Sequence, residues 1–171
     1  MNGTEGAMRV GLGCIGRNEG ERLRRCLHSV RAGGIDHAVY VDSGSTDGSV
    51  DVARSLGVEV VELDCKAPFT AARARNAGAA RLIERHPEIE AIQFLDSDCV
   101  LEPGWIEHGR EQLALDERLG VVVGRRSEIH PDASIYNKLC ELELEIEPGE
   151  ITWFGGDAMV RRRAFDGVGA Y

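Results

Sequence analysis

The segment Gln93-Phe-Leu-Asp96-Ser-Asp98-Cys places two carboxylates, one residue apart, directly after an apolar run. An unpaired carboxylate is costly to bury, so Asp96 and Asp98 are not expected to be core residues. Side chains two residues apart on an extended chain point the same way, which predicts that both carboxylates face one target. Magnesium and manganese prefer oxygen ligands and commonly combine one or two carboxylates with substrate phosphates. The spacing therefore indicates a divalent-metal site, with helix capping by Asp98 as the alternative.

A second polar segment, Val41-Asp-Ser-Gly-Ser-Thr-Asp-Gly-Ser49, follows another short apolar run. Polar side chains at the carboxyl ends of parallel strands line the crevice in which such sheets bind ligands. Asp42 precedes the turn and is therefore a candidate ligand-binding residue. Ser45 or Thr46 is expected to cap the following helix, and Asp47 to favour its N-terminus, which is a structural role.

A third segment, Gly11-Leu-Gly13-Cys-Ile-Gly16, literally matches the GxGxxG pattern of dinucleotide-binding folds. In those folds a full strand precedes the first glycine and the third glycine lies inside the helix. Here only three residues of the expected strand precede Gly11, and the helix is expected to begin near Asn18. We therefore interpret these glycines as strand positions. A dinucleotide-binding domain remains the alternative, and Asp42 is the feature in its favour.

These segments lie in a chain whose apolar runs alternate with amphipathic stretches, a pattern typical of an α/β sheet covered by helices. Strands are expected at 8–15, 37–41, 58–63, 91–95 and 120–124, with one or two more at 151–160. Helices are expected at 19–31, 45–57, 70–85, 103–115 and 133–146. No repeat or linker divides the chain, so we predict a single domain over residues 1–171.

The composition is globular, with 43% hydrophobic and 29% charged residues. A net charge of −9 argues against nucleic-acid binding over the whole surface, because that mode needs lysine and arginine to neutralise phosphates. The five cysteines never form a CxxC pair, so they indicate neither a disulfide framework nor a zinc site, and a cytoplasmic location is expected. No stretch approaches the roughly 18 apolar residues of a membrane span, so no transmembrane segment is expected.

Together these segments resemble family 2 glycosyltransferases of the GT-A fold, from about Met8 to the last residue. The matching motifs, in chain order, are Arg17-Asn18-Glu19 before a leucine-rich helix, VDSGSTDGS against VDDGSTDGT, Arg75-Asn76-Ala77-Gly78 against R-N-x-G, Asp96-Ser97-Asp98 against DxD, and the GG…RR-x-x-F segment between Trp153 and Gly169. A lone DxD is a weak signal, whereas five motifs in the right order are a strong one. The implied fold is a Rossmann-like three-layer α/β/α sandwich with a mostly parallel central sheet.

The resemblance implies an inverting hexosyltransferase that uses Mn²⁺ or Mg²⁺ and no redox cofactor. It implies a nucleoside-diphosphate sugar donor, UDP- or GDP-linked, and a carbohydrate or lipid-linked hydroxyl acceptor, with a peripheral position at the inner face of the membrane as one possible location. The implied donor-binding residues are Arg17, Asn18, Glu19, Asp42, Arg75 and Asp96. Asp42 takes the place of the base-contacting aspartate, and Arg75 reaches the diphosphate unless it is an ordinary surface charge. Asp98 is the principal metal ligand, with Asp96 beside it.

Three features depart from the family's pattern. Ser43 replaces a second aspartate, and Cys99 follows the DxD where a third acid is common; we interpret Cys99 as a small semi-buried side chain. The family's catalytic base usually lies beyond the segment that ends here at Tyr171, so we expect the chain to lack the family's C-terminal region. Asp157, directly after Gly156, is the candidate base, with a turn or strand-end aspartate as the alternative. The competing hypotheses are a non-catalytic nucleotide-sugar-binding module and a related nucleotidyltransferase.

Overall fold

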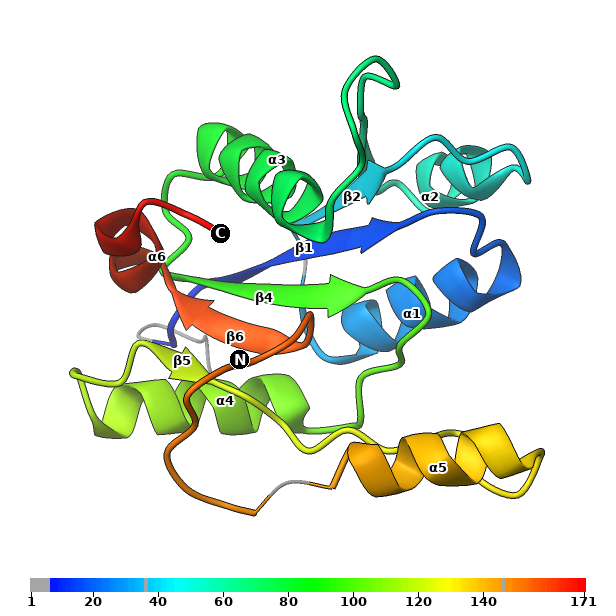
Figure 1. The fold of residues 1–171 in the computed structure, drawn as a ribbon. Helices are drawn as coiled ribbons and strands as arrows, with labels where there is room; N and C mark the ends of the chain where they lie inside the picture. Colours follow the sequence, from blue (N-terminus) through cyan, green and yellow to red (C-terminus); the bar gives the residue numbers. More distant parts are fainter. Residues whose placement is uncertain (1–6, 36, 146) are drawn as a thin grey trace.

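A six-stranded sheet forms the centre of the structure, a computed structural model that describes residues 7–35, 37–145 and 147–171 (Figure 1). The strands are β1 (Val10–Gly16), β2 (Ala38–Asp42), β3 (Glu59–Glu62), β4 (Ala91–Asp96), β5 (Val121–Val122) and β6 (Ala158–Arg161). Their order in the sheet is β3-β2-β1-β4-β6-β5. The first four strands are parallel, and β6 runs antiparallel to both β4 and β5.

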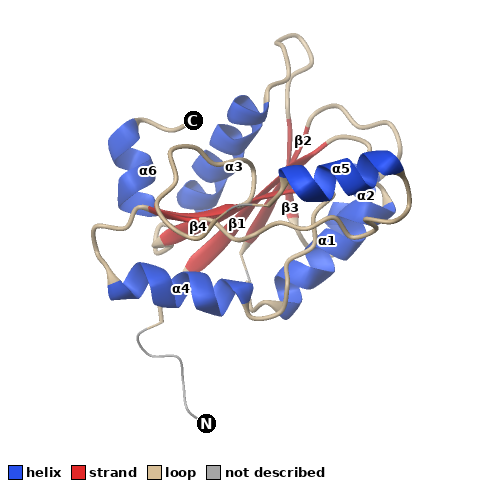
Figure 2. Cartoon of the chain, turned by 60° about the horizontal axis from the view of Figure 1, so that its bottom comes forward, coloured by secondary structure: helices blue, strands red, loops and turns tan. Residues whose placement is uncertain are grey.

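Helices cover both faces of this sheet, as Figures 1 and 2 show. The helices are α1 (Glu21–Ala32), α2 (Ser49–Ser55), α3 (Ala71–Arg85), α4 (Trp105–Leu115), α5 (Ile135–Glu143) and α6 (Arg162–Val168). One core cluster joins the sheet to α1, α2 and α4, and a second joins the other face to α3 and α6. The expected three-layer α/β/α sandwich with a mostly parallel sheet is confirmed. None of the described helices is both long and apolar enough to cross a membrane.

Helix α3 lies unusually close to the sheet because two glycines face each other there. A Cβ built on Gly78 would lie 3.0 Å from Val41 Cγ2 and 3.8 Å from the Cα of Gly13. The helix begins where Thr70 Oγ1 accepts a hydrogen bond from the backbone N–H of Arg73. The close approach at Gly78 and the N-cap at Thr70 position α3, which carries Arg75, against the sheet.

The three glycines of the GxGxxG match all lie within β1, as expected. Helix α1 begins only at Glu21, five residues after Gly16. The third glycine therefore does not open a helix, and the strand-to-helix turn of a dinucleotide-binding fingerprint is not formed.

Several expected elements differ in the structure. The helix expected from Pro103 begins at Trp105, and the strand expected over 120–124 is limited to Val121–Val122. Two others differ more. The helix expected from residue 45 begins at Ser49, and its N-cap is Gly48 rather than Ser45 or Thr46. The Ser45 hydroxyl instead accepts a hydrogen bond from the backbone N–H of Asn18, which removes it from a capping position. The one or two strands expected over 151–160 are limited to β6, because the pairing of β6 with β4 begins only at Ala158, opposite Phe94.

The last part of the chain adds one helix that the sequence pattern did not predict. Helix α6 follows β6 without an intervening loop and places Phe165 in the core under α3. Helix α5 ends at Glu143, within the range expected for it, and the predicted end at Ile146 lies outside the described residues.

Candidate functional site

Three of the candidate residues, Asp42, Asp96 and Asp157, meet at one edge of the sheet because of the strand directions. Parallel strands β2 and β4 end at Asp42 and Asp96, and β1 between them ends at Gly16. Strand β6 is antiparallel to β4, so Asp157, which immediately precedes it, lies at the same edge. The chain runs from β1 outward to β3 and then returns to β4 on the other side of β1. The crevice between β1 and β4 is therefore the topological switch point where α/β sheets bind ligands.

A cavity of about 280 Å³ occupies this switch point. It is lined by Ile15, Gly16, Glu19, Ala71, Arg75, Asp96, Ser97 and Asp98. The structure thus brings together four of the predicted residues: Glu19, Arg75, Asp96 and Asp98. Asp96 and Asp98 were expected to face one way because they lie two residues apart on an extended chain. This reason was wrong, because the chain turns directly after β4, where the Cys99 N–H donates to the Asp96 carbonyl. The two carboxylates nevertheless line the same cavity.

Arg75 forms one wall of the cavity and pairs with Asp96. Its Nη2 lies 2.9 Å from Asp96 Oδ1, and its side chain is only 12% exposed. The aromatic ring of Tyr171 lies over the guanidinium at 5.3 Å. A Cβ on Gly156 would overlap both Arg75 and Asp96, so the backbone at Gly156 closes directly over this ion pair. The alternative interpretation of Arg75, as an ordinary charge on the helix surface, is therefore wrong.

Asp98 remains exposed, without an arginine or lysine partner among the ion pairs of the described residues. Its negative charge raises the pKa values of neighbouring acidic groups. Burial raises the pKa of Glu19 and Asp98 raises it further, while Arg22, whose Nε lies 2.7 Å from Glu19 Oε2, lowers it. Burial and then Asp98 also hold the pKa of the Cys99 thiol above its ordinary value, which keeps Cys99 a neutral side chain.

These groups fit a hard divalent cation. The cavity collects the carboxylates of Glu19, Asp96 and Asp98 against one arginine, an excess of negative charge that a cation would neutralise. Asp96 is engaged by Arg75, whereas Asp98 is exposed and its Oδ1 accepts a hydrogen bond from the Cys99 thiol at 3.5 Å. Within the described part of the chain, these three carboxylates do not converge as three ligand atoms within 4.8 Å. Mg²⁺ is usually bound by one or two carboxylates together with the phosphates of a ligand. The carboxylates of this cavity therefore suit a cation that binds together with a diphosphate.

Asp42 lies at the same edge but does not line the cavity. It is 2% exposed, and its Oδ2 accepts hydrogen bonds from the backbone N–H groups of Gly44 and Ser45 at 2.9 and 2.8 Å. Its Oδ1 accepts a hydrogen bond from the hydroxyl of Tyr40. In the structure Asp42 therefore holds the turn after β2 in place.

Asn18 joins this turn to the end of β1. Its backbone N–H donates to Ser45 Oγ, and its side-chain oxygen accepts a hydrogen bond from the Thr46 N–H at 2.7 Å. Asn18 has a left-handed backbone (φ 57°), a conformation that asparagine tolerates better than most residues. Arg17 is exposed, and its guanidinium lies 5.6 Å from the ring centroid of Phe69. Neither residue lines the cavity between β1 and β4.

Asp157 faces the α4 side of the sheet, away from Arg75, and is held there by a chain of hydrogen bonds. Trp105 Nε1 donates to Gln93 Oε1 at 2.8 Å, and Gln93 Nε2 donates to Asp157 Oδ1 at 2.7 Å. Burial raises the pKa of Asp157 to about 6, against the opposing effects of Gln93 and Arg126. A carboxylate with a pKa near neutrality can accept and release a proton under ordinary conditions.

The sequence reasoning missed Gln93, Trp105 and Phe69. Gln93 carried a usable signal, because a single polar residue inside the apolar run Ala91 to Leu95 must find buried hydrogen-bond partners. Trp105 and Phe69 carried no comparable signal, since an isolated aromatic residue is equally typical of the core.

Comparison with known proteins identifies the family to which the chain belongs. Residues 16–168 match the family model described as Glycosyl transferase family 2. The chain belongs to glycosyl transferase family 2. Among curated proteins, a TPR repeat-containing protein from Synechococcus elongatus is 33% identical over 135 residues, which cover 78% of this chain and 31% of that protein.

Solved structures share the fold of this family 2 domain. Glucosyl-3-phosphoglycerate synthase from Mycobacterium tuberculosis in complex with UDP is 18% identical (TM-score 0.60), and the match covers 93% of this chain and 58% of that one. A mannosyltransferase from Pyrobaculum calidifontis in complex with GDP-Man and Mn²⁺ is 20% identical (TM-score 0.66), covering 95% and 47%. The chain thus spans about half the length of these two proteins. The GT-A fold expected from the sequence is confirmed.

Proposed function

We propose that this family 2 domain transfers a hexose from a nucleoside-diphosphate sugar to a hydroxyl acceptor. The observation that carries the proposal is the cavity at the switch point, where Asp98, Asp96, Glu19 and Arg75 converge in a family 2 fold. The related structures with UDP and with GDP-Man and Mn²⁺ support a nucleotide-sugar donor of the UDP or GDP class and a manganese or magnesium cofactor.

Each residue of the cavity has a role in donor binding in this proposal. Asp98 holds a divalent cation, with Asp96 beside it, and Arg75 supplies a fixed positive charge toward the diphosphate. Arg75 is suited to this because Asp96, Tyr171 and Gly156 restrict its movement, so little side-chain entropy is lost on binding. When bound, the cation would stabilise the negative charge that develops on the diphosphate leaving group. Glu19 and the turn held by Asp42 and Asn18 border the nucleoside, with Arg17 next to them.

The acceptor hydroxyl requires a carboxylate to take its proton. Asp157 is the candidate base, because its pKa of about 6 leaves it largely ionised at neutral pH yet able to hold a proton, and because Gln93 fixes its orientation. Attack from the side opposite the diphosphate would invert the configuration at the anomeric carbon. The acceptor is proposed to be a carbohydrate or a lipid-linked hydroxyl.

A non-catalytic nucleotide-sugar-binding module is the second candidate. It is favoured by one observation, that Asp157 does not line the cavity formed by Asp98 and Arg75. The two functions share donor contacts and differ in whether the bond between sugar and diphosphate is broken.

Release of nucleoside diphosphate from a panel of UDP- and GDP-linked hexoses, with Mn²⁺ and with and without sugar acceptors, tests the proposal. A transferase releases UDP or GDP from at least one donor, releases it faster with the right acceptor, and loses this activity in Asp157→Asn while keeping donor affinity. Donor binding without release under any of these conditions would identify a binding module. Absence of binding to every nucleotide sugar in the panel would refute both functions.

A further inference from the structure

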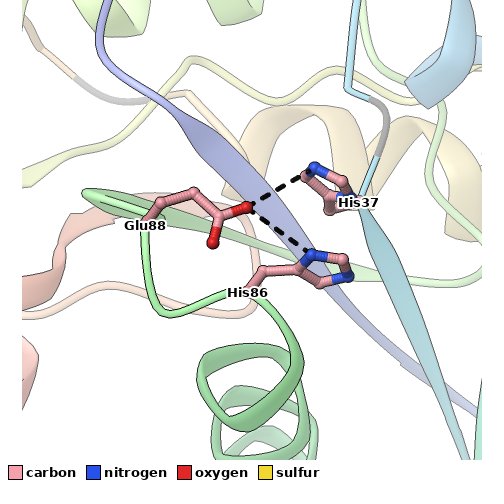
Figure 3. Close-up of side chains that lie close together, drawn as sticks. All are labelled: His37, His86 and Glu88. Carbon is pink, nitrogen blue, oxygen red and sulfur yellow. Dashed lines mark ion pairs between the residues drawn. The ribbon is translucent and has the colours of Figure 1, made fainter.

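A second group of potential metal ligands lies at the opposite edge of the sheet, outside the proposed sugar-transfer site. His37 immediately precedes β2, His86 follows the last turn of α3, and Glu88 lies in the short connection from α3 to β4 (Figure 3). Strands β2 and β4 end at the donor edge and begin at this one, so the strands separate the two sites. None of the three residues takes part in the function proposed above.

The three side chains converge on one point. Glu88 Oε1 lies 3.9 Å from His37 Nε2 and 3.7 Å from His86 Nδ1, and all three ligand atoms lie within 4.8 Å of one another. The imidazole rings are stacked, with centroids 3.7 Å apart and planes inclined by 26°. Figure 3 shows both rings directing a nitrogen toward the same carboxylate oxygen. Among the ion pairs of the described residues, Glu88 has only these two histidines as partners.

The backbone under each ligand is held by hydrogen bonds. The carbonyl of His37 accepts from the Leu12 N–H on β1, and the N–H of His86 donates to the Leu82 carbonyl within α3. The Ile89 N–H donates to the His86 carbonyl, which closes the turn that carries Glu88. Pro87 between the two ligands fixes its own φ and disfavours a helical backbone at His86, whose φ and ψ are −134° and 69°. The ligands are therefore presented by ordered backbone rather than by a long loop.

We propose that His37, His86 and Glu88 bind one zinc ion. Zinc favours imidazole nitrogens and carboxylate oxygens at about 2.0–2.2 Å in a tetrahedral arrangement, in which ligand atoms lie about 3.4 Å apart. The observed separations of 3.7 and 3.9 Å are only a few tenths of an ångström longer, and the stacked imidazole rings would rotate so that the nitrogen of each points at the ion. Two nitrogen ligands exclude magnesium and calcium, which take oxygen. The cysteines of the chain, which gave no sign of a zinc site, are not involved.

The proposed ion has one open coordination position. Three protein ligands leave the fourth to water or a small anion, as in zinc sites that are not purely structural. A cavity of about 270 Å³ adjoins the site and is lined in part by His37, His86, Arg31 and Glu59. The ion would link the start of β2 to the turn between α3 and β4, so zinc binding should stabilise the fold by an amount that grows with the logarithm of its affinity.

Calorimetric titration of tag-free protein with ZnCl₂ tests this site, on an Asp98→Asn background that removes the proposed donor-edge ligand. We expect one zinc per chain, and affinity at least about a hundredfold weaker in His86→Ala and in His37→Ala, since even indirect partners of a metal change its affinity about 10–100-fold. Glu88→Gln keeps the side-chain shape and should weaken binding as well. His108→Ala and His130→Ala, which alter exposed histidines outside the cluster, should bind zinc as the parent does.

A measurement on unsubstituted protein covers the case in which a histidine variant fails to fold. Zinc should protect His37 and His86 from diethyl pyrocarbonate, as read by peptide mass spectrometry, while His108 and His130 remain reactive. Equal zinc affinity in the parent and the cluster variants, or equal modification of all four histidines with and without zinc, would overturn the proposal. Neither result bears on sugar transfer, because donor binding depends on the other edge of the sheet.

Discussion

Replacing Asp157 with asparagine should change the pH dependence of stability in a specific direction. The pKa of Asp157 is raised from 3.8 to about 6 in the folded protein, mainly by burial. A raised folded-state pKa means that the protonated acid is the form favoured by folding. Its contribution to the free energy of unfolding is fully present below about pH 3.8 and is lost as the pH rises through about 6. The asparagine side chain has nearly the same shape and can still accept the hydrogen bond from Gln93.

The magnitude follows from the size of the shift. About two pKa units at 1.36 kcal/mol each correspond to at most about 3 kcal/mol. The free energy of unfolding of the parent minus that of Asp157→Asn should therefore fall by up to about 3 kcal/mol between about pH 4 and about pH 7. Urea denaturation of both proteins at each pH, followed by circular dichroism, measures this difference directly.

Asp116→Asn provides a control of opposite sign. Arg118 lowers the pKa of Asp116, so its contribution to stability is present above the unfolded pKa and is lost on acidification. A difference between the parent and Asp157→Asn that stays flat from about pH 4 to about pH 7, or that rises, would refute the argument that burial perturbs this carboxyl group.

Two further substitutions test the packing that forms the donor edge. Gly156→Ala should weaken UDP binding at least about tenfold by calorimetry, since its Cβ would displace the Arg75 and Asp96 side chains. Gly155→Ala meets only ordinary contacts with Arg126 from 3.5 Å and should bind UDP as the parent does. Equal losses of UDP affinity in both variants would contradict this reasoning. Gly78→Val should lower the free energy of unfolding by about 1–3 kcal/mol in urea denaturation, because the new side chain would separate α3 from Val41 and Gly13, and unchanged stability would show that the close approach of α3 is not required.

The sequence predicted a helix or strand well where a regular hydrophobic pattern extended over the whole element. The buried stripe of Leu23, Cys26, Leu27 and Val30 identified α1 correctly, and the apolar run of 91–95 identified β4. The strand expected over 151–160 was wrong over most of its length, because a strand requires a hydrogen-bonded neighbour and the sequence does not reveal which strand pairs with β6 or in which register. The start of α2 was displaced because Asn18, 27 residues earlier, engages the hydroxyl of Ser45.

The candidate site was predicted by motif rather than by geometry. Glu19, Arg75, Asp96 and Asp98 line one cavity, because motifs at the ends of parallel strands are brought to one edge by the topology. Arg17, Asn18 and Asp42 lie outside this cavity, and their contacts with a nucleoside remain predictions. The pairing of Arg75 with Asp96 and the orientation of Asp157 by Gln93 depend on contacts between elements far apart in the chain, which residue spacing does not encode.

In the proposed function, Asp98 binds a divalent cation that in turn binds the donor diphosphate. The most direct measurement is the affinity for UDP at increasing Mn²⁺ concentration, by calorimetry, for the parent, Asp98→Asn and the control Glu102→Gln, an exposed carboxylate that follows the same strand but does not line the cavity. Mn²⁺ should increase UDP affinity at least about tenfold in the parent and in Glu102→Gln, and should have little effect in Asp98→Asn. Equal enhancement by Mn²⁺ in all three proteins would contradict the claim.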